Sequence, residues 1–281
     1  MIKFFIIELF HRDVILINGF FPKEEKLGQA NFGDDLNFHL IHLMTQKKVV
    51  PTSYSVMWRF FRRESYSCIG SILNDVDSDT IVWGSGAIEN KLKDSFCPKK
   101  IYAVRGPLTR ELVLQKGIEC PEVYGDPAML ISCYYTPNVI KEKKKVGFIP
   151  HYVDKNNQFL IHYKNDDNVL IIDTQSYGSW RDFIDMIVSC EVIVSSSLHG
   201  IIIADTYNVP NVWCRFSDDI VGGEFKYKDY FLSVNKEIPT PLYFDRCFDL
   251  DYLLSMKEKW QKPQINVTSL IDSCPFYNTN R

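Results

Sequence analysis

The segment that decides the fold is Val192-Ile193-Val194-Ser195-Ser196-Ser197-Leu198-His199-Gly200-Ile201-Ile202-Ile203-Ala204-Asp205. Its first three residues predict a short buried strand, and a helix is expected to open near Leu198, after a turn of three serines. Backbone N–H groups at a helix start point outward and, together with the helix dipole, favour binding of an anion. His199 lies in the first turn of this helix, where an imidazole can exchange a proton with a bound group. The alternative from these residues alone is a purely structural histidine.

The composition indicates a globular chain with room for more than one core. It has 281 residues, of which 46% are hydrophobic, and a formal net charge of −3. General nucleic-acid binding is not expected, because it needs a basic surface. The eight cysteines form no CxxC pair, which favours reduced thiols over a disulfide framework or a zinc site. No run of about 18 apolar residues indicates a membrane span, so we expect a cytoplasmic protein.

The first half of the chain predicts strands followed by helices. Ile2–Ile7 reads as a buried strand and not as a signal peptide, because Lys3 and Glu8 interrupt the apolar N-terminus. Asp34 or Asp35 is expected to cap one helix, and Pro107 to begin another. Further strands are expected at Cys68–Leu73, Ile81–Trp83 and Ile101–Val104.

The second half repeats the pattern after Tyr134–Lys145, which we expect to be a solvated linker. Trp180, Phe183, Ile184 and Ile187 have helical spacing and are expected in a core. Strands are expected at Val146–Ile149, Val169–Ile172, Val192–Val194 and Val209–Cys214, and terminal helices at Asp251–Trp260 and Val267–Ile271. The predicted fold class is therefore α/β, with domains at residues 1–133 and 146–250 and C-terminal helices at 251–281.

Polar and charged residues gather at the predicted strand ends of both halves, where open α/β sheets bind ligands. They are Asn31, Asp34, Asp35, Arg105 and Arg110 in the first half, and His151, Ser195–Ser197, His199, Arg215 and Lys226 in the second. Two domains that face each other across a cleft would bring these sets together, which favours a transferase. The alternatives are Asp34 as only a helix cap, Arg105 as the partner of a carboxylate such as Asp126, and Lys226 within an aromatic packing segment.

Common nucleotide and hydrolase fingerprints are absent from the sequence. Gly84-Ser85-Gly86 lacks the third glycine of a dinucleotide loop, and no Walker A sequence occurs. No Gly-x-Ser-x-Gly elbow occurs either, which argues against an α/β-hydrolase. No group of residues has the spacing of metal ligands, so we expect no metal.

Six short motifs carry a resemblance to a known family. In chain order they are Asn31-Phe32-Gly33-Asp34-Asp35, Val82-Trp83-Gly84-Ser85-Gly86, Val104-Arg105-Gly106-Pro107-Leu108-Thr109-Arg110, Gly125-Asp126-Pro127-Ala128, Ile149-Pro150-His151 and Ser195-Ser196-Ser197-Leu198-His199-Gly200. In these motifs the chain resembles the polysaccharide pyruvyl transferase family, especially its bacterial exopolysaccharide branch. The likeness runs from about Asn31 to Phe231.

This resemblance implies a GT-B-like fold, in which two Rossmann-type domains face each other across the active site. It also implies transfer of the carboxyvinyl-derived group of phosphoenolpyruvate to two hydroxyls of a sugar, which gives a pyruvate ketal and inorganic phosphate. The implied acceptor is a lipid-linked or nucleotide-linked sugar of a surface-polysaccharide precursor. No cofactor is implied beyond phosphoenolpyruvate as co-substrate, and a peripheral contact with the inner face of the membrane is compatible with such an acceptor.

The resemblance also implies roles for individual residues. His199 matches the family's motif histidine, which would bind phosphate or act as the acid, and Asp34 would be an acceptor-side base or orienting group. Predicted donor contacts are the backbone amides of Ser195, Ser196, Ser197 and Leu198, together with Arg105, His151, Lys226 and Arg215. Predicted acceptor contacts are Asn31, Gly33, Asp35 and Ser85.

One position departs from the pattern of many members. They carry arginine directly before the Leu-His pair, where this chain has Ser197. A positive charge for the donor must then come from elsewhere, and Lys226, Arg215, Arg105 and His151 are the candidates. The alternatives to pyruvyl transfer are a GT-B glycosyltransferase that uses a sugar nucleotide and a non-catalytic sugar- or anion-binding homologue.

Overall fold

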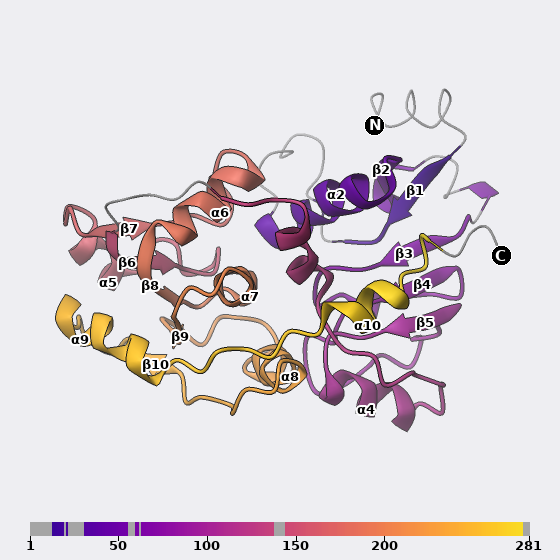
Figure 1. Cartoon of the computed structure of the whole chain (residues 1–281). Coiled ribbons are helices and arrows are strands. Elements are labelled where there is room, and N and C mark those ends of the chain that lie inside the picture. Colours follow the sequence, from indigo (N-terminus) through magenta and orange to yellow (C-terminus); the bar gives the residue numbers. More distant parts are fainter. Residues whose placement is uncertain are drawn as a thin grey trace. The chain divides into compact units, whose positions relative to one another are not determined.

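The packing of the chain forms two compact units. The structure is a computed structural model that describes residues 13–19, 21, 31–55, 60–61, 63–137 and 144–277. The first unit takes in the chain through Leu130, Glu224–Val234 and the residues from Ile265 onward, and the second contains Ile131–Gly223 and Asn235–Gln264. The two units interleave along the sequence, as the colours of Figure 1 show.

These units differ from the expected domain boundaries in two segments. Glu224–Val234 was expected in the second domain but packs with the first unit. The predicted group of C-terminal helices is divided, since the chain returns to the first unit at Ile265. The predicted strand Ile2–Ile7 lies outside the described residues.

The first unit is built on a parallel five-stranded sheet with the order β2-β1-β3-β4-β5. Its strands are β1 Val14–Ile17, β2 Lys48–Pro51, β3 Ser65–Ser67, β4 Thr80–Trp83 and β5 Lys100–Ala103. Its helices are α2 Phe32–Thr45, α4 Pro107–Gln115, α8 Phe225–Ser233 and α10 Val267–Asp272, with short 3₁₀ turns η2 Thr52–Tyr54 and η3 Leu73–Asp75. A further 3₁₀ segment, η4 Pro127–Cys133, leads out of this unit.

The sequence predicted this unit in part. The strands at Ile81–Trp83 and Ile101–Val104 and the helix that begins at Pro107 are confirmed. The strand predicted at Cys68–Leu73 is wrong, because β3 ends at Ser67 and Gly70 has a φ of +125°, which breaks an extended chain. The strands β1 and β2 were not predicted.

The second unit is a parallel five-stranded sheet with the order β10-β9-β8-β6-β7. Its strands are β6 Lys144–Ile149, β7 Val169–Ile171, β8 Cys190–Ser195, β9 Asn211–Arg215 and β10 Leu242–Tyr243. Its helices are α5 Gln158–Tyr163, α6 Trp180–Val188, α7 Leu198–Thr206 and α9 Leu250–Ser255, followed by the 3₁₀ turn η5 Met256–Lys259. The four strands predicted in this half are confirmed, with small shifts at their ends. Lys144 and Lys145 belong to β6 and not to the predicted linker.

Local sequence explains the elements around the centre of the second sheet. The central strands β6 and β8 consist largely of buried residues, including the apolar side chains of Phe148, Val192 and Val194. Helix α6 begins with a capping box of Ser179 and Asp182 and buries the predicted face of Trp180, Phe183, Ile184 and Ile187. These packed central strands fix the start of α7 at the carboxyl ends of the strands.

Both sheets have the same doubly wound strand order, 2-1-3-4-5 in order of appearance along the chain. In such a sheet the carboxyl ends of the first and third strands form the point where ligands bind. These points lie after β1 and β3 in the first unit, and after β6 and β8 in the second. Most of the residues singled out in the sequence follow these strands or their neighbours.

Candidate functional site

The turn between β8 and α7 is fixed to the end of β6 by hydrogen bonds. The Ser196 amide donates to the Ile149 carbonyl (3.1 Å). The Ser195 hydroxyl donates to the carbonyl of Ile149 (3.0 Å) or of Ser197 (2.9 Å), and it accepts the Ser197 amide (3.0 Å). Gly200 is needed here, because a Cβ atom would lie 2.5 Å from the Ser195 Oγ atom. The turn and the start of α7 are therefore preorganised.

A buried aspartate that the sequence analysis did not assign to the site orients the middle serine. Asp154 is 3% exposed and accepts the hydroxyls of Ser196 (3.1 Å) and Ser217 (2.5 Å). The Ser196 oxygen in turn accepts the His151 amide (2.9 Å). Because a hydroxyl has one proton, Ser196 has none left to donate to a ligand. Asp154 thus ties together the loops that follow β6, β8 and β9.

Ser197 differs from the two serines before it. It is the N-cap residue of α7, but its side chain makes no cap, and its hydroxyl forms no hydrogen bond with a described residue. The first amides of a helix have no partner within the helix, so the Ser197 hydroxyl and the amides that follow can serve an anion. The amides of Ser196 and Ser197, which were predicted to bind the anion, are already used by the Ile149 carbonyl and the Ser195 hydroxyl, so the amides left for an anion begin at Leu198.

The two predicted histidines lie in this same unit. His199 is in the first turn of α7 and 8% exposed, and His151 follows β6 with its ring 4.3 Å from that of Tyr152. Arg215 ends β9, where its guanidinium pairs with Asp218 (2.5 Å) and lies over the ring of Tyr243 (5.4 Å). The switch point of the second sheet thus brings together His151, the serine turn and His199.

The corresponding point of the first unit holds the predicted acceptor residues. Helix α2 begins at Phe32, so the expectation that Asp34 or Asp35 caps it is wrong; both lie in its first turn, where acidic groups suit the helix dipole. Asp34 is 9% exposed. The Asn31 Oδ1 atom just before the helix is buried and has no hydrogen-bond partner among the described residues. Gly33 is buried and Asp35 is half-buried.

Buried side chains fix this edge in the same way as in the second unit. Asn37 is fully buried and exchanges hydrogen bonds with the amide (2.9 Å) and carbonyl (3.0 Å) of Ile69, just after β3. Ser85 donates to the Gly70 carbonyl (2.9 Å) and is fully buried, so its hydroxyl proton is used inside the protein. The sequence analysis did not single out Asn37, since an asparagine within a helix carries no signal of its distant partner.

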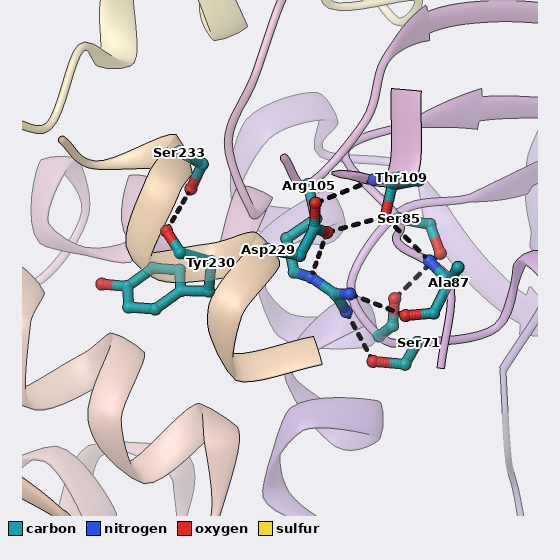
Figure 2. Close-up of polar contacts among 9 residues, drawn as sticks. Ser71, Ser85, Ala87, Arg105, Thr109, Asp229, Tyr230 and Ser233 are labelled. Atoms are coloured by element: carbon teal, nitrogen blue, oxygen red, sulfur yellow. Dashed lines mark hydrogen bonds and ion pairs between the residues drawn. The ribbon is translucent and has the colours of Figure 1, made fainter. Parts of the chain in front are cut away.

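Arg105 follows β5 and is completely buried (Figure 2). Its Nε donates to Asp229 (3.0 Å), Nη1 to the Ser71 hydroxyl (2.5 Å) and Nη2 to the Ala87 carbonyl (2.7 Å). Asp229 also accepts the amide (2.9 Å) and hydroxyl (2.6 Å) of Thr109 at the start of α4. The alternative that Arg105 pairs with a carboxylate is therefore confirmed, with Asp229 as the partner in place of Asp126. The burial of Arg105 favours a role in holding α8 over direct contact with a donor.

Lys226 lies on the first turn of α8 and is 7% exposed. Its ammonium forms no hydrogen bond or ion pair with any described residue, and it lies 5.4 Å from the ring centre of Tyr227. Burial, and secondarily the nearby charge of Arg105, lower the pKa of Lys226 from 10.5 to about 8. Buried cations are ordinarily paired, and Lys226 differs from the buried Arg105 in that no described residue offers it an ion pair.

No group of three or more His, Cys, Asp or Glu side chains is arranged to hold a metal ion in the part of the chain that the structure describes. Within the same part, no helix has the length and apolar character to cross a bilayer.

Comparisons with known proteins identify the family of the chain. The family model of polysaccharide pyruvyl transferase matches residues 31–218. An uncharacterised protein, L143 of Acanthamoeba polyphaga mimivirus, is 30% identical over 93% of this chain and 88% of its own length. The succinoglycan biosynthesis protein ExoV of Rhizobium meliloti is 30% identical over 72% of this chain and 60% of its own length. Among solved structures, an uncharacterised protein of Klebsiella pneumoniae matches with a TM-score of 0.46 and 12% identity, over 86% of this chain and 96% of that chain.

Proposed function

The chain belongs to the polysaccharide pyruvyl transferase family, and on this premise we propose that it forms a pyruvate ketal on a sugar with phosphoenolpyruvate as donor. The observation that carries the proposal is the preorganised turn before α7, with an uncapped helix start and His199 in its first turn. The sugar belongs to a lipid-linked or nucleotide-linked precursor of a surface polysaccharide. A relative named for succinoglycan biosynthesis supports this class of acceptor.

The chemistry needs an acid, a base and donors for anionic groups. A proton adds to the methylene carbon of phosphoenolpyruvate, and the neighbouring carbon becomes electrophilic. One sugar hydroxyl attacks that carbon and the second replaces phosphate, so that two C–O bonds form and the C–O bond to phosphate breaks. Of the two protons lost by the hydroxyls, one restores the acid that protonated the methylene carbon, and the other leaves on inorganic phosphate. General acid–base groups and hydrogen-bond donors for the anion lower the barriers of these steps.

The proposed roles follow from the two edges. In the second unit, the Ser197 hydroxyl and the first amides of α7 bind an anionic group of the donor, and His199 binds phosphate or supplies the proton. In the first unit, Asp34 accepts or orients an acceptor hydroxyl, beside Asn31. We assign the two units to the two Rossmann-type domains of a GT-B-like enzyme, which is supported by the same strand order in both sheets.

A peripheral membrane contact is part of the proposal, because lipid-linked acceptors reside at the bilayer surface. Two neighbouring phenylalanines, Phe60 and Phe61, are 72% and 68% exposed, and in the sequence they lie among Arg59, Arg62 and Arg63. Aromatic and basic residues together favour an anionic lipid surface. Replacing both phenylalanines by serine is expected to reduce co-sedimentation with phosphatidylserine vesicles, whereas Ile161→Ser, at an equally exposed apolar site, should not. Equal sedimentation of all three proteins would exclude this contact.

The proposed reaction is tested first by calorimetric titration of the purified protein with phosphoenolpyruvate and with a panel of sugar nucleotides. His199→Ala is compared with His162→Ala, a change at an exposed histidine of α5. We expect phosphoenolpyruvate to bind the wild-type protein and His162→Ala with similar affinity, and to bind His199→Ala more weakly. Binding of a sugar nucleotide without any response to phosphoenolpyruvate would instead identify a glycosyltransferase.

A further inference from the structure

We propose that Lys226 is a direct anion-binding residue, whose ammonium binds the carboxylate or phosphate of the donor. The assignment rests on the proposed function for the identity of that donor, but not for the presence of an anion site. It selects one residue from the four cations that the sequence left as equal candidates to replace the positive charge absent at Ser197.

The first argument is that the ammonium of Lys226, at the end of a mostly buried side chain, has no ion-pair or hydrogen-bond partner among the described residues. The ammonium of a side chain that is only 7% exposed lacks both an ion pair and a hydrogen bond with the described residues. Removal of an ammonium from water is costly unless hydrogen bonds or a counter-charge replace the water. A bound anion is the natural group to supply both.

The second argument is that the neighbouring carboxylates are already engaged. Glu224, two residues before Lys226, pairs with Lys228 (2.8 Å). Asp229 accepts Arg105 and both donors of Thr109. Because Asp229 is the counter-ion of Arg105, the nearby charges of Arg105 and Lys226 leave one positive charge in excess, which favours an anion.

The third argument is that buried contacts hold helix α8, which carries Lys226, in a fixed position. The Arg105–Asp229 pair joins α8 to the ends of β4 and β5, as Figure 2 shows. A Cβ atom on Gly106 would lie 2.1 Å from the Asp229 carbonyl oxygen, so only glycine permits this approach of the helix. The N-cap residue Glu224 makes no side-chain cap, and the first turn that carries Lys226 therefore keeps its dipole available to the same anion.

The other three candidate cations fit an anion less well. Arg105 is fully buried and donates from all three of its nitrogen atoms to the protein. Arg215 is paired with Asp218 and stacked on Tyr243. The ring of His151 packs on Tyr152. Lys226 also lies over an aromatic ring, that of Tyr227, but it differs from Arg105 and Arg215 in that its cationic group forms no ion pair with a described residue.

The test compares three variants of the full chain by titration with phosphoenolpyruvate, inorganic phosphate and pyruvate. Lys226→Met removes the charge, Lys226→Arg keeps it, and Lys228→Met removes an exposed charge from the same helix. We expect Lys226→Met to weaken phosphoenolpyruvate binding by about 10- to 100-fold, as for a charged hydrogen bond, and the other two to stay within a few-fold of wild type. Loss of response to phosphate alone or to pyruvate alone identifies which group Lys226 binds.

Each outcome decides the inference separately from the proposed function. If the wild-type protein binds phosphoenolpyruvate and Lys226→Met binds it equally well, the inference is overturned and the function stands. If the wild-type protein binds only a sugar nucleotide, the function falls, and the same three variants titrated with that nucleotide decide the role of Lys226. A wild-type protein that binds none of these anions overturns the inference.

Discussion

The charge of Lys226 should lower the stability of the folded protein, although it favours binding of the donor. Its pKa in the folded protein, about 8, is below the ordinary value of 10.5, so the unfolded chain binds more protons between these values. Stability should therefore increase as the pH rises from about 8 to 10.5 and stay at its lower level below pH 8. The groups that set this shift are the surrounding protein and Arg105, which is itself paired with Asp229.

Lys226→Met should then stabilise the protein at pH 7, by up to about 3 kcal/mol. Urea unfolding at pH 7 and at pH 10 checks both the sign and the pH dependence, with Lys228→Met as the control. A loss of stability in Lys226→Met at pH 7 would show that the ammonium has a structural partner. Greater stability together with weaker donor binding is the combination expected of a functional group.

Ser196 and Ser197 are neighbours with different expected effects. Ser196→Ala leaves the buried Asp154 with one donor fewer, which should cost about 1–3 kcal/mol of folding free energy. Ser197→Ala removes no hydrogen bond with a described residue, so stability should change by about 0.5 kcal/mol or less while phosphoenolpyruvate affinity falls by about 10-fold. Thermal melts and calorimetry of the two variants check this. The same loss of stability in both would contradict the assignment of the hydroxyls.

Among the elements, α8 depends most on a single buried contact. Asp229→Ala would leave the Arg105 charge buried without its counter-ion and remove both bonds to Thr109. We expect a loss of about 3–5 kcal/mol, the range for removal of one member of a buried pair. Arg105→Ala should cost a similar amount, and the double variant much less than the sum of the two, because the residues share one interaction.

Urea unfolding of these three variants provides the double-mutant cycle. An additive result would mean that the two side chains stabilise the protein independently, against the geometry in Figure 2. The comparison also separates placement of α8 from binding by Lys226, because Asp229→Ala should impair both and Lys226→Met only the second.

At the element scale, short-range signals predicted what depends on short-range forces. The hydrophobic run of β8, the start of α7 and the apolar face of α6 were all visible, because strand burial and helix periodicity leave local patterns. The prediction of a strand at Cys68–Leu73 was wrong because burial and strand structure do not coincide in this segment. Cys68 and Ile69 are buried in irregular chain, whereas the true strand β3 carries Ser65 and Ser67, which are buried polar residues that look like loop residues in the sequence.

At the scale of the whole molecule, the sequence could not show which residues far apart in the chain pair with each other. The bonds between Asp229 and Arg105 join residues 124 positions apart, and no local pattern announces them. The sequence named Arg105 and Lys226 as candidates but could not tell that one is saturated by the protein and the other is not. The sequence also could not show that Glu224–Val234 packs with the first unit. The apolar residues of a short helix that also carries charges do not reveal which unit they pack against.

The last turns of the chain provide a test of this interleaved arrangement. The Trp83 indole of β4 donates to the Leu270 carbonyl (3.0 Å) in α10, and the Phe276 ring packs on those of Trp83 (5.8 Å) and Tyr66 (4.7 Å). Leu270 and Cys274 are fully buried. The first unit therefore includes a helix that is synthesised after the entire second unit.

A chain that ends at Gln264 should accordingly lose stability in one unit only. Hydrogen exchange is expected to rise in β3 and β4, where Tyr66 and Trp83 become uncovered, and to stay near its full-length level in β6 and β8, whose core contains no residue beyond Gln264. Equal loss of protection in both sheets would instead show that the two units unfold as one cooperative body. If only the first unit opens, the turn before α7 that we propose to bind the donor should survive truncation, while the proposed anion contact of Lys226 is lost, so that the two proposed contacts can be tested separately.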